Sequence, residues 1–223
     1  MPDYKAPFTK EEIEAGKHRR RVGGKWHRLG KLQLEFLKSV GLQPDHYLLD
    51  VGCGALRGGI RFVDYLEPAH YYGIDINDTL LDAGYRKELK KRHREKLPRE
   101  NLRAVDRFEA DFGVQFDYAL AQSVFTHVSL NHIRLALFQV AKVLKPGGKF
   151  YATFFEAPDD LPLDGVLPIG KGLLQETNSY WYYRDDLRWA CSFGPWEYRY
   201  IGDWNHPSKQ QMVEYTRTEG PAA

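Results

Sequence analysis

Two acids and a pair of glycines mark the stretch of the chain whose residue types and spacing point most directly to chemistry. The segment 50–54 reads Asp-Val-Gly-Cys-Gly and follows a short apolar run, and a second apolar run ends in Asp75. Glycine has no Cβ atom, so a ligand can approach the backbone closely at Gly52 and Gly54. A carboxylate about 20 residues after such glycines can accept hydrogen bonds from both ribose hydroxyls. The order of strand, glycine turn, helix and strand with a terminal acid therefore predicts a nucleotide-binding βαβ unit.

The spacing of the glycines separates two classes of cofactor. A dinucleotide site requires the pattern G-x-G-x-x-G, and here Arg57 stands where its third glycine belongs. The segment Asp50-Val51-Gly52-Cys53-Gly54 instead resembles motif I of the class I S-adenosylmethionine (SAM) methyltransferases, in which an acid is followed by glycines at alternate positions. A third alternate glycine is common in that family, and Leu56 replaces it here. The resemblance implies SAM as the methyl donor and S-adenosyl-L-homocysteine (SAH) as the product. The alternative is a glycine turn that binds no ligand.

Later segments extend the resemblance. Asp111 and Phe112 match the position after the third strand where the family binds adenine, the acid at the exocyclic amine and the apolar side chain against the ring. Gln122 and Ser123 end the fourth strand, which in the family passes the methyl group, and the phrase LKPGGKFYATFF at 144–155 is typical of the approach to the fifth strand. The predicted cofactor-binding residues are Asp50, Gly52, Cys53, Gly54, Asp75, Ile76, Asp111, Phe112, Gln122 and Ser123.

Two histidines are candidates for the catalytic group. Methyl transfer from a sulfonium is an in-line displacement, so alignment and exclusion of water supply most of the catalysis. A base is needed only for a protonated oxygen or nitrogen. His127 follows the fourth strand near the expected acceptor entrance, and His206 lies in the polar link 204–209. Either can be structural instead, and His127 could cap the helix that follows it. No metal site is expected, because the predicted ends of strands four and five, Gln122 and Glu156, offer too few oxygen ligands.

Hydrophobic periodicity predicts alternating helices and strands around this unit. Helices are expected at about 10–21, 27–40, 60–66, 78–96, 130–144 and 185–193, and strands at 47–50, 71–75, 102–105, 116–122, 150–156, 196–203 and 211–217. The resemblance implies a Rossmann-like α/β three-layer sandwich whose seven-stranded, mostly parallel sheet has an antiparallel last strand. We expect one domain over 1–223, with an N-terminal helical cap at 1–45 and a lid insertion rich in proline and glycine at 157–183. Trp26 and His27 in the cap either line the pocket or pack the helix onto the body.

Composition and charge narrow the compartment and the partners. Apolar content of 43% and charged content of 28% are ordinary for a soluble globular domain. The chain has no apolar run of 18 residues and no apolar segment at its N-terminus, so neither a membrane span nor a signal peptide is expected. Two cysteines, Cys53 and Cys191, cannot form a disulfide framework. These features predict a cytoplasmic protein, monomeric or homodimeric. The basic stretches 17–31 and 86–100 are either solvated helix faces, the interpretation we favour, or nucleic-acid contacts.

The sequence thus predicts a SAM-dependent methyltransferase with a small-molecule acceptor. The methyl group would pass to an oxygen or nitrogen atom, or to another nucleophile, of that acceptor. The segment after strand four reads Gln-Ser-Val-Phe at 122–125 and lacks the Asn/Asp-Pro-Pro-aromatic motif of the enzymes that methylate amino groups of adenine and glutamine. With that subclass and the metal-assisted one set aside, a small-molecule acceptor is favoured, under a lid that ends in the aromatic residues 180–183. Two alternatives remain: a methyltransferase that acts on RNA or protein through the basic stretches, and a SAM-binding module without catalysis.

Overall fold

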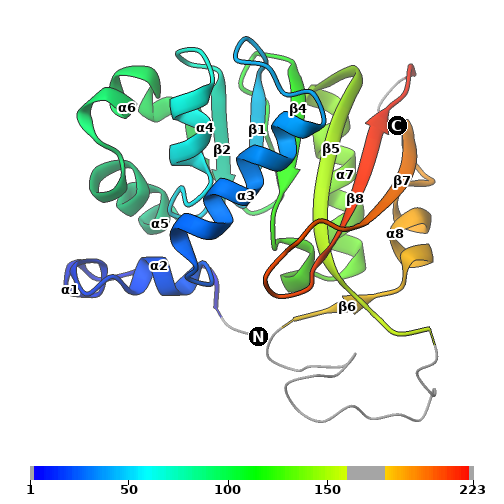
Figure 1. The fold of residues 1–223 in the computed structure, drawn as a ribbon, viewed down its shortest axis with the longest axis horizontal. Coiled ribbons are helices and arrows are strands. Elements are labelled where there is room, and N and C mark those ends of the chain that lie inside the picture. The colour runs from blue at the N-terminus through cyan, green and yellow to red at the C-terminus, as the bar shows by residue number, and fades with distance from the viewer. Residues whose placement is uncertain (1–2, 160–178, 221–223) are drawn as a thin grey trace.

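Strands that are buried on both faces form the middle layer of an α/β sandwich. The computed structural model describes residues 3–159 and 179–220. Seven strands follow one another in the order β3-β2-β1-β4-β5-β8-β7, and an eighth, β6, pairs with the end of β5 (Figure 1). Their bounds are β1 Leu48–Val51, β2 Tyr71–Asp75, β3 Leu102–Ala104, β4 Phe116–Ala121, β5 Leu144–Glu156, β6 Trp181–Tyr182, β7 Trp196–Asp203 and β8 Gln211–Arg217.

The direction of the strands explains where a ligand can bind. The strands β1 to β5 are mutually parallel, and β8 runs antiparallel to both of its neighbours, β5 and β7. The predicted mostly parallel sheet with an antiparallel last strand is therefore confirmed. Because carboxyl ends of parallel strands meet at one edge of a sheet, the loops after β1, β2 and β4 converge there.

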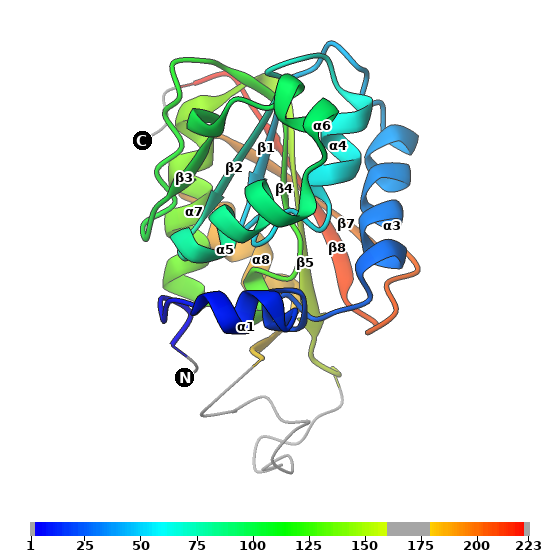
Figure 2. The same ribbon diagram turned by 90° about the vertical axis from the view of Figure 1, so that its left-hand side faces the viewer.

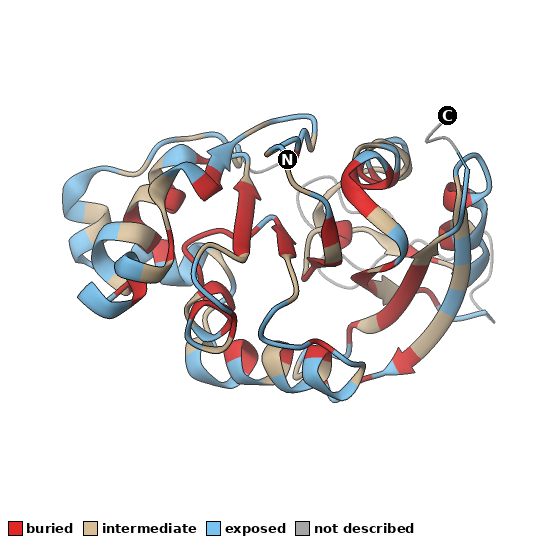
Figure 3. Cartoon of the chain, turned by 90° about the horizontal axis from the view of Figure 1, so that it is seen from above, coloured by how far each residue is buried: buried red, intermediate tan, exposed pale blue. Residues whose placement is uncertain are grey.

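Helices cover both faces of the sheet and enclose two separate cores. One face carries α3 (Trp26–Ser39), α4 (Gly59–Tyr65), α5 (Asp78–Ala83) and α6 (Lys91–Lys96), and the other carries α7 (Leu130–Val143) and α8 (Arg184–Cys191) (Figure 2). Successive side chains of a strand point to opposite faces, so Leu48 packs into the core under α3 and α4, and Leu49 packs into the core under α7. Figure 3 shows buried strands between helices whose outer faces are exposed.

Two segments that the sequence predicts as continuous helices are divided, one at Gly16 and the other at Leu89 and Lys90, whose backbone is extended. The segment 10–21 forms α1 (Lys10–Glu14) and α2 (Lys17–Arg21), because Gly16 takes the left-handed conformation, with φ of +71°. The segment 78–96 is interrupted after α5 by a π-helical turn, Gly84–Glu88. A Cβ atom on Gly84 would lie 2.8 Å from the Ala55 backbone, so this close approach to the glycine turn requires glycine.

The strand β5 begins earlier than periodicity indicates. It starts at Leu144 rather than at about 150, and the predicted turn at 145–149 is an irregularity within the strand, with Gly147 at φ of +78°. Most of the predicted lid insertion, 160–178, lies outside the described residues. Its two ends are joined to each other by a hydrogen bond from Ala157 N to Tyr182 O (3.0 Å), and a hydrogen bond from Tyr180 N to Thr126 O (2.7 Å) holds the second end to the body.

The N-terminal helices lie across the edge of the sheet where the parallel strands end. In Figure 1, α2 lies below α5, and in Figure 2, α1 lies below β1 and β2. We call residues 3–25, which include both helices, the N-terminal strap. In the described part of the chain, no helix has the length and apolar character needed to cross a membrane.

Candidate functional site

A cavity of about 530 Å³ opens at the carboxyl ends of the parallel strands. Its walls come from the glycine turn after β1, the end of β2, the loop after β4, the strap residues 20–25 and the loop 206–210. Of the twelve residues predicted as cofactor-binding or catalytic, the cavity brings together ten: Asp50, Gly52, Cys53, Gly54, Asp75, Ile76, Gln122, Ser123, His127 and His206. The other two, Asp111 and Phe112, do not line it.

The glycine turn leaves room at the cavity wall that no other residue would leave. Gly52 and Gly54 have φ of +72° and +54°, in the left-handed region that side chains with a Cβ rarely adopt. A Cβ atom on Gly54 would lie 2.6 Å from Cγ1 of Val22 in the strap, and one on Gly52 would collide with Val124. The backbone N–H groups of Gly52 and Cys53 both donate to Ile74 O, which ties the turn to β2.

Asp75 at the end of β2 is oriented by backbone donors. Its Oδ2 accepts from Gly54 N and its Oδ1 accepts from Asn77 N, each at 2.9 Å. Burial raises the pKa of Asp75 above its usual value, although these hydrogen bonds from Asn77 and Gly54 oppose the shift. Each carboxylate oxygen keeps a further acceptor position, so the side chain can accept from a vicinal diol such as that of ribose.

Asp50 at the end of β1 is a buried carboxyl with one hydrogen-bond donor. Tyr71 Oη donates to Asp50 Oδ2 at 2.7 Å. Burial, opposed by that hydrogen bond and by Arg57 but reinforced by Asp75, raises the pKa of Asp50 to about 7. Cys53 is a free thiol whose pKa burial also raises, so it is neutral and contributes packing and backbone rather than a nucleophile.

Arg57, which breaks the dinucleotide pattern, is a site residue that sequence reasoning missed. It is only 8% exposed, lines the cavity, and donates to the strap carbonyls Val22 O and Gly24 O. Its Nη2 donates to Gln122 Oε1, which also accepts from Gln33 Nε2 at 2.7 Å. Gly58 leaves the space that Gln33 occupies. The signal for Arg57 was available, because a cation replaces glycine inside a ligand-binding turn.

The loop after β4 carries a polar network toward the second predicted histidine. Gln122 Nε2 donates to Ser123 Oγ and lies 3.3 Å from Nε2 of His206. His206 Nδ1 accepts from Ser208 N at 3.2 Å. Burial, together with Arg57 and Lys25, lowers the pKa of His206 to about 4. The N–H groups of Gln122 and Ser208 face the two ring nitrogens. A protonated ring carries an N–H at each nitrogen, so it would place donor against donor on both sides, which disfavours protonation.

His127 faces the cavity from a short 3₁₀ turn, Phe125–His127. Its Nδ1 lies 3.0 Å from the hydroxyl of Tyr4, so strap and loop meet at this residue. The N-cap of α7 is Ser129, whose carbonyl accepts from Ile133 N at 3.0 Å. His127 therefore does not cap α7, which removes the structural role that the sequence left open.

The structure places the two residues expected at adenine outside the cavity. Asp111 is exposed and its Oδ1 accepts from Gly113 N, while Phe112 packs against Tyr72 and under Arg103. The chain turns into the cavity five residues earlier, where Asp106 and Phe108 line it, with Phe108 at φ of +61°. The third strand ends at Ala104, one residue before its predicted end, and Asp106 follows it after a single intervening residue.

The strap closes the cavity on the side away from the sheet. Glu88 is buried against it, and its carboxylate accepts from His18 Nε2 at 2.6 Å and from Arg19 at 2.8 and 2.6 Å. Burial alone would raise the pKa of Glu88, but these donors hold that pKa below its usual value. Asn77 Nδ2 donates to Tyr4 O and Ala6 O, each at 2.9 Å. Three basic residues of the stretch 17–31 line the cavity: Arg20, Arg21 and Lys25.

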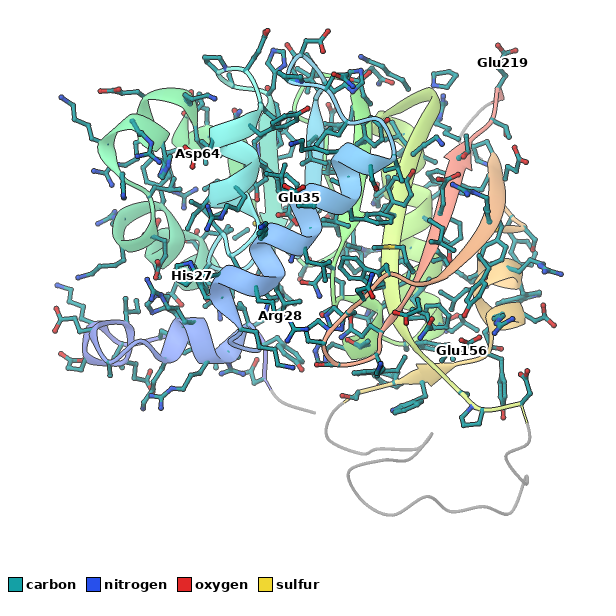
Figure 4. The ribbon with its side chains drawn as sticks, viewed as in Figure 1. His27, Arg28, Glu35, Asp64, Glu156 and Glu219 are labelled. Atoms are coloured by element: carbon teal, nitrogen blue, oxygen red, sulfur yellow. The ribbon has the colours of Figure 1, made fainter. Side chains whose placement is uncertain are left out.

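Trp26 and His27 do not line the cavity. The ring of Trp26 packs under the guanidinium of Arg19, at 5.0 Å, and His27 is exposed. Figure 4 shows His27 and Arg28 at the first turn of α3, where the strap joins the body. Between the two interpretations of Trp26, the structure supports packing. Within 3–159 and 179–220, no three His, Cys, Asp or Glu side chains gather as a metal site would require.

Comparison with known proteins agrees with this geometry. Residues 49–150 match the sequence profile of a methyltransferase domain family. The chain is 29% identical over 155 residues to the 18S rRNA (guanine(1575)-N(7))-methyltransferase of Saccharomyces cerevisiae, covering 65% of this chain and 53% of that protein. It is 26% identical over 182 residues to the ubiquinone/menaquinone biosynthesis C-methyltransferase UbiE of Brucella canis, covering 73% and 62%. The chain thus spans about half to three fifths of the length of these relatives.

Solved structures show the same fold. The magnesium protoporphyrin IX methyltransferase of Synechocystis PCC 6803, crystallised with bound SAM, superposes with a TM-score of 0.63 at 16% identity. The superposition covers 92% of this chain and 91% of that protein.

Proposed function

Because the chain belongs to the class I SAM-dependent methyltransferases, we propose that it transfers the methyl group of SAM to an oxygen or nitrogen atom of a small-molecule acceptor. The observation that carries this proposal is the cavity that joins the glycine turn and Asp75 to Gln122, Ser123 and His127. Donor and acceptor would meet in one enclosed space, as an in-line displacement requires.

The residues at the glycine-turn end fit SAM group by group. The left-handed glycines provide close backbone approach, and Asp75 presents both carboxylate oxygens for the ribose diol. Asp106 and Phe108 replace the predicted pair at adenine, as acceptor for its amine and as apolar wall. Arg57 and the strap arginines Arg20 and Arg21 supply positive charge for the methionine carboxylate. Arg57 Nε is buried without a hydrogen-bond partner among the described residues, as expected of a cation that awaits an anion.

Catalysis then rests on alignment and desolvation. SAM, when bound, supplies an electrophilic methyl group on a sulfonium, and the chain holds the acceptor in line with it and excludes water. The strap performs the exclusion, since Val22 lies over Gly54 and Tyr4 reaches His127.

If the acceptor atom carries a proton, His127 is the residue proposed to take it. His206, the second candidate, has a pKa near 4 and would hold a proton poorly at neutral pH. Because Gln122 and Ser208 already face its two ring nitrogens, His206 is better suited to positioning the loop 206–210 beside Gln122.

An RNA acceptor is the second candidate function, favoured by the similarity to an rRNA methyltransferase and by the basic strap. The enclosure of the cavity by the strap favours the small molecule, because an RNA strand would have to displace it. A SAM-binding module without catalysis is the third.

The deciding experiment combines binding and transfer. Calorimetry first measures SAM and SAH affinity, and methyl-labelled SAM is then incubated with a small-metabolite fraction and, separately, with total RNA. Label in a metabolite supports the proposal, whereas label only in RNA supports the rRNA-like alternative. Binding without transfer in either fraction supports the non-catalytic module.

A further inference from the structure

We propose that the loop between β7 and β8 recognises the acceptor, and that it selects a molecule with a carboxylate next to the nucleophilic atom. This inference rests on the methyltransferase function proposed above. It begins from Gln210, which is 4% exposed, lines the cavity, and has an amide nitrogen with no hydrogen-bond partner among the described residues.

The surrounding hydroxyls determine which way the Gln210 amide points. The Thr153 hydroxyl accepts from Ser123 N at 2.7 Å and donates its own hydrogen to Gln210 Oε1, also at 2.7 Å. Ser123 Oγ accepts from Gln122 Nε2 and donates to Gln210 Oε1 at 2.9 Å. The Gln210 oxygen therefore receives two donors, and its Nε2, a donor itself, is left for a ligand.

Arg57 sets which groups of this network donate hydrogen bonds and which accept them. A guanidinium only donates, so the atom of Gln122 that faces Arg57 must be the carbonyl oxygen, which also accepts from Gln33 Nε2 at 2.7 Å. Gln122 Nε2 is then the donor to Ser123. The hydrogen bonds therefore run in one direction from Arg57 in the cofactor turn to Gln210 Oε1. The donor left unused, Gln210 Nε2, lies at the end of the cavity proposed for the methyl acceptor.

The loop that presents Gln210 is held in one conformation. Trp204 Nε1 donates to Gln210 O at 3.0 Å, and the indole stacks on the ring of His206 with centroids 5.4 Å apart. Asn205 and Lys209 occupy the left-handed region, with φ of +66° and +60°, a strain that surrounding structure must compensate. A preorganised loop loses little conformational entropy when a ligand binds.

Charge favours an anionic group at this end. Lys25 Nζ lies 3.3 Å from Ser208 Oγ, so the strap places a cation over the loop. The acids that line the cavity are Asp50 and Asp75, which belong to the cofactor cradle, and Asp106, which pairs with Lys5 at 2.8 Å. Among the described lining residues, the segments 122–128 and 206–210 contribute no carboxylate.

An apolar wall completes the acceptor end. Phe155 lines the cavity and stacks on Trp181, with centroids 5.2 Å apart and an angle of 20° between the rings. A flat ring that carries a carboxylate matches this wall together with the Gln210 and Lys25 donors. Aromatic acids with an adjacent hydroxyl or amino group are therefore suitable probes.

The test uses acids and their neutral amides as matched pairs. The SAH complex of the full chain is titrated with 2-hydroxybenzoate against 2-hydroxybenzamide, and with 2-aminobenzoate against 2-aminobenzamide. We expect at least one acid to bind more tightly than its amide, and Gln210→Leu and Lys25→Gln each to weaken that acid by about tenfold or more, the usual loss for a hydrogen bond to a charged group. SAH affinity should stay within about twofold in Lys25→Gln, and Lys209→Gln, which removes a loop charge outside the cavity, should change nothing.

The outcomes separate this inference from the function itself. If SAH does not bind the parent chain, the proposed function fails. If SAH binds but no acid binds better than its amide, the carboxylate inference is overturned and the function stands. Lys25 is exposed, so its variant keeps the test valid if Gln210→Leu does not fold. If a uridine 12-mer binds the SAH complex more tightly than every acid, and Lys25→Gln weakens it, the acceptor is RNA and the inference is wrong.

Discussion

Gly54 and Asp75 form one structural unit, because the backbone N–H of Gly54 donates to Asp75 Oδ2 at 2.9 Å. The two residues stand 21 positions apart in the chain and at the ends of neighbouring parallel strands. A substitution at either residue should disturb the orientation of the other. Each substitution should therefore lower the affinity for SAM.

Replacing Gly54 by alanine should weaken SAM binding by tenfold or more. The new Cβ would lie 2.6 Å from Val22 Cγ1, and alanine at φ of +54° adds backbone strain of about 1–2 kcal/mol. Gly113→Ala is the matched control, since Gly113 has φ of +76° and its Cβ would point into open space. Calorimetry of SAM with both variants checks this, and an equal loss in Gly113→Ala would show that the effect is not specific to the glycine turn.

Replacing Asp75 by alanine should weaken SAM binding by about 1–3 kcal/mol, the usual loss for a charge-assisted pair of hydrogen bonds. Asp78→Ala, at the exposed start of α5, should leave SAM affinity unchanged. Calorimetry on the two variants gives the comparison. Unchanged affinity in Asp75→Ala would mean that the ribose binds elsewhere.

The adenine position can be tested by replacing Asp106 and Asp111 with alanine, one at a time. Asp106→Ala should reduce the discrimination between SAH and S-inosylhomocysteine, because the acceptor for the exocyclic amine is lost, whereas Asp111→Ala should keep it. Competition binding of the two nucleosides provides the measurement. The opposite result would restore Asp111 to the site and reject the placement of Asp106.

Asp50 should make SAM binding depend on pH. Its pKa in the free protein is about 7, well above the ordinary carboxyl value. The contribution of Asp50 to the free energy of unfolding therefore falls as pH rises from about 4 to 7, because the unfolded chain loses this proton first. A cationic sulfonium favours the ionised form, so SAM affinity should increase through about pH 7, by roughly tenfold between pH 6 and 8. Asp50→Asn should abolish that increase and should stabilise the free protein above pH 7. Calorimetry and thermal unfolding across this range measure both effects, and a parallel pH dependence in the variant would assign it to another group.

His127 should matter for transfer and not for folding. His127 faces the cavity as the proposed base, so His127→Ala should cut labelled methyl transfer at least roughly tenfold while SAM affinity stays within about twofold. The N-cap of α7 is Ser129, so the variant removes no helix cap. Ser129→Ala is the control, expected to lower the melting temperature by a few degrees at most and to keep transfer. Normal transfer in His127→Ala would show that the acceptor needs no base from this residue.

The sequence alone determined the parts of this protein that depend on local patterns. The glycine turn and Asp75 were predictable because backbone conformation and ligand approach limit the residues allowed there. The terminal strands 196–203 and 211–217 were predicted with the bounds that the structure shows, since alternation at period two is read within each strand. The mostly parallel sheet with an antiparallel last strand was implied by the resemblance to the class I methyltransferases, which the motifs carry in their order along the chain.

Only the tertiary structure decided which distant segments share the cavity. The insertion of β8 between β5 and β7 brings the loop 204–210 to the end of β4, and the folding of the strap over Gly54 brings Arg57 between strap and Gln122. Asp111 and Asp106 have the same chemistry in one short segment, and the place where β3 ends, not residue type, puts Asp106 at the cavity. Such contacts join residues with many positions between them, and their geometry depends on the packing of the whole sheet, which local periodicity does not encode.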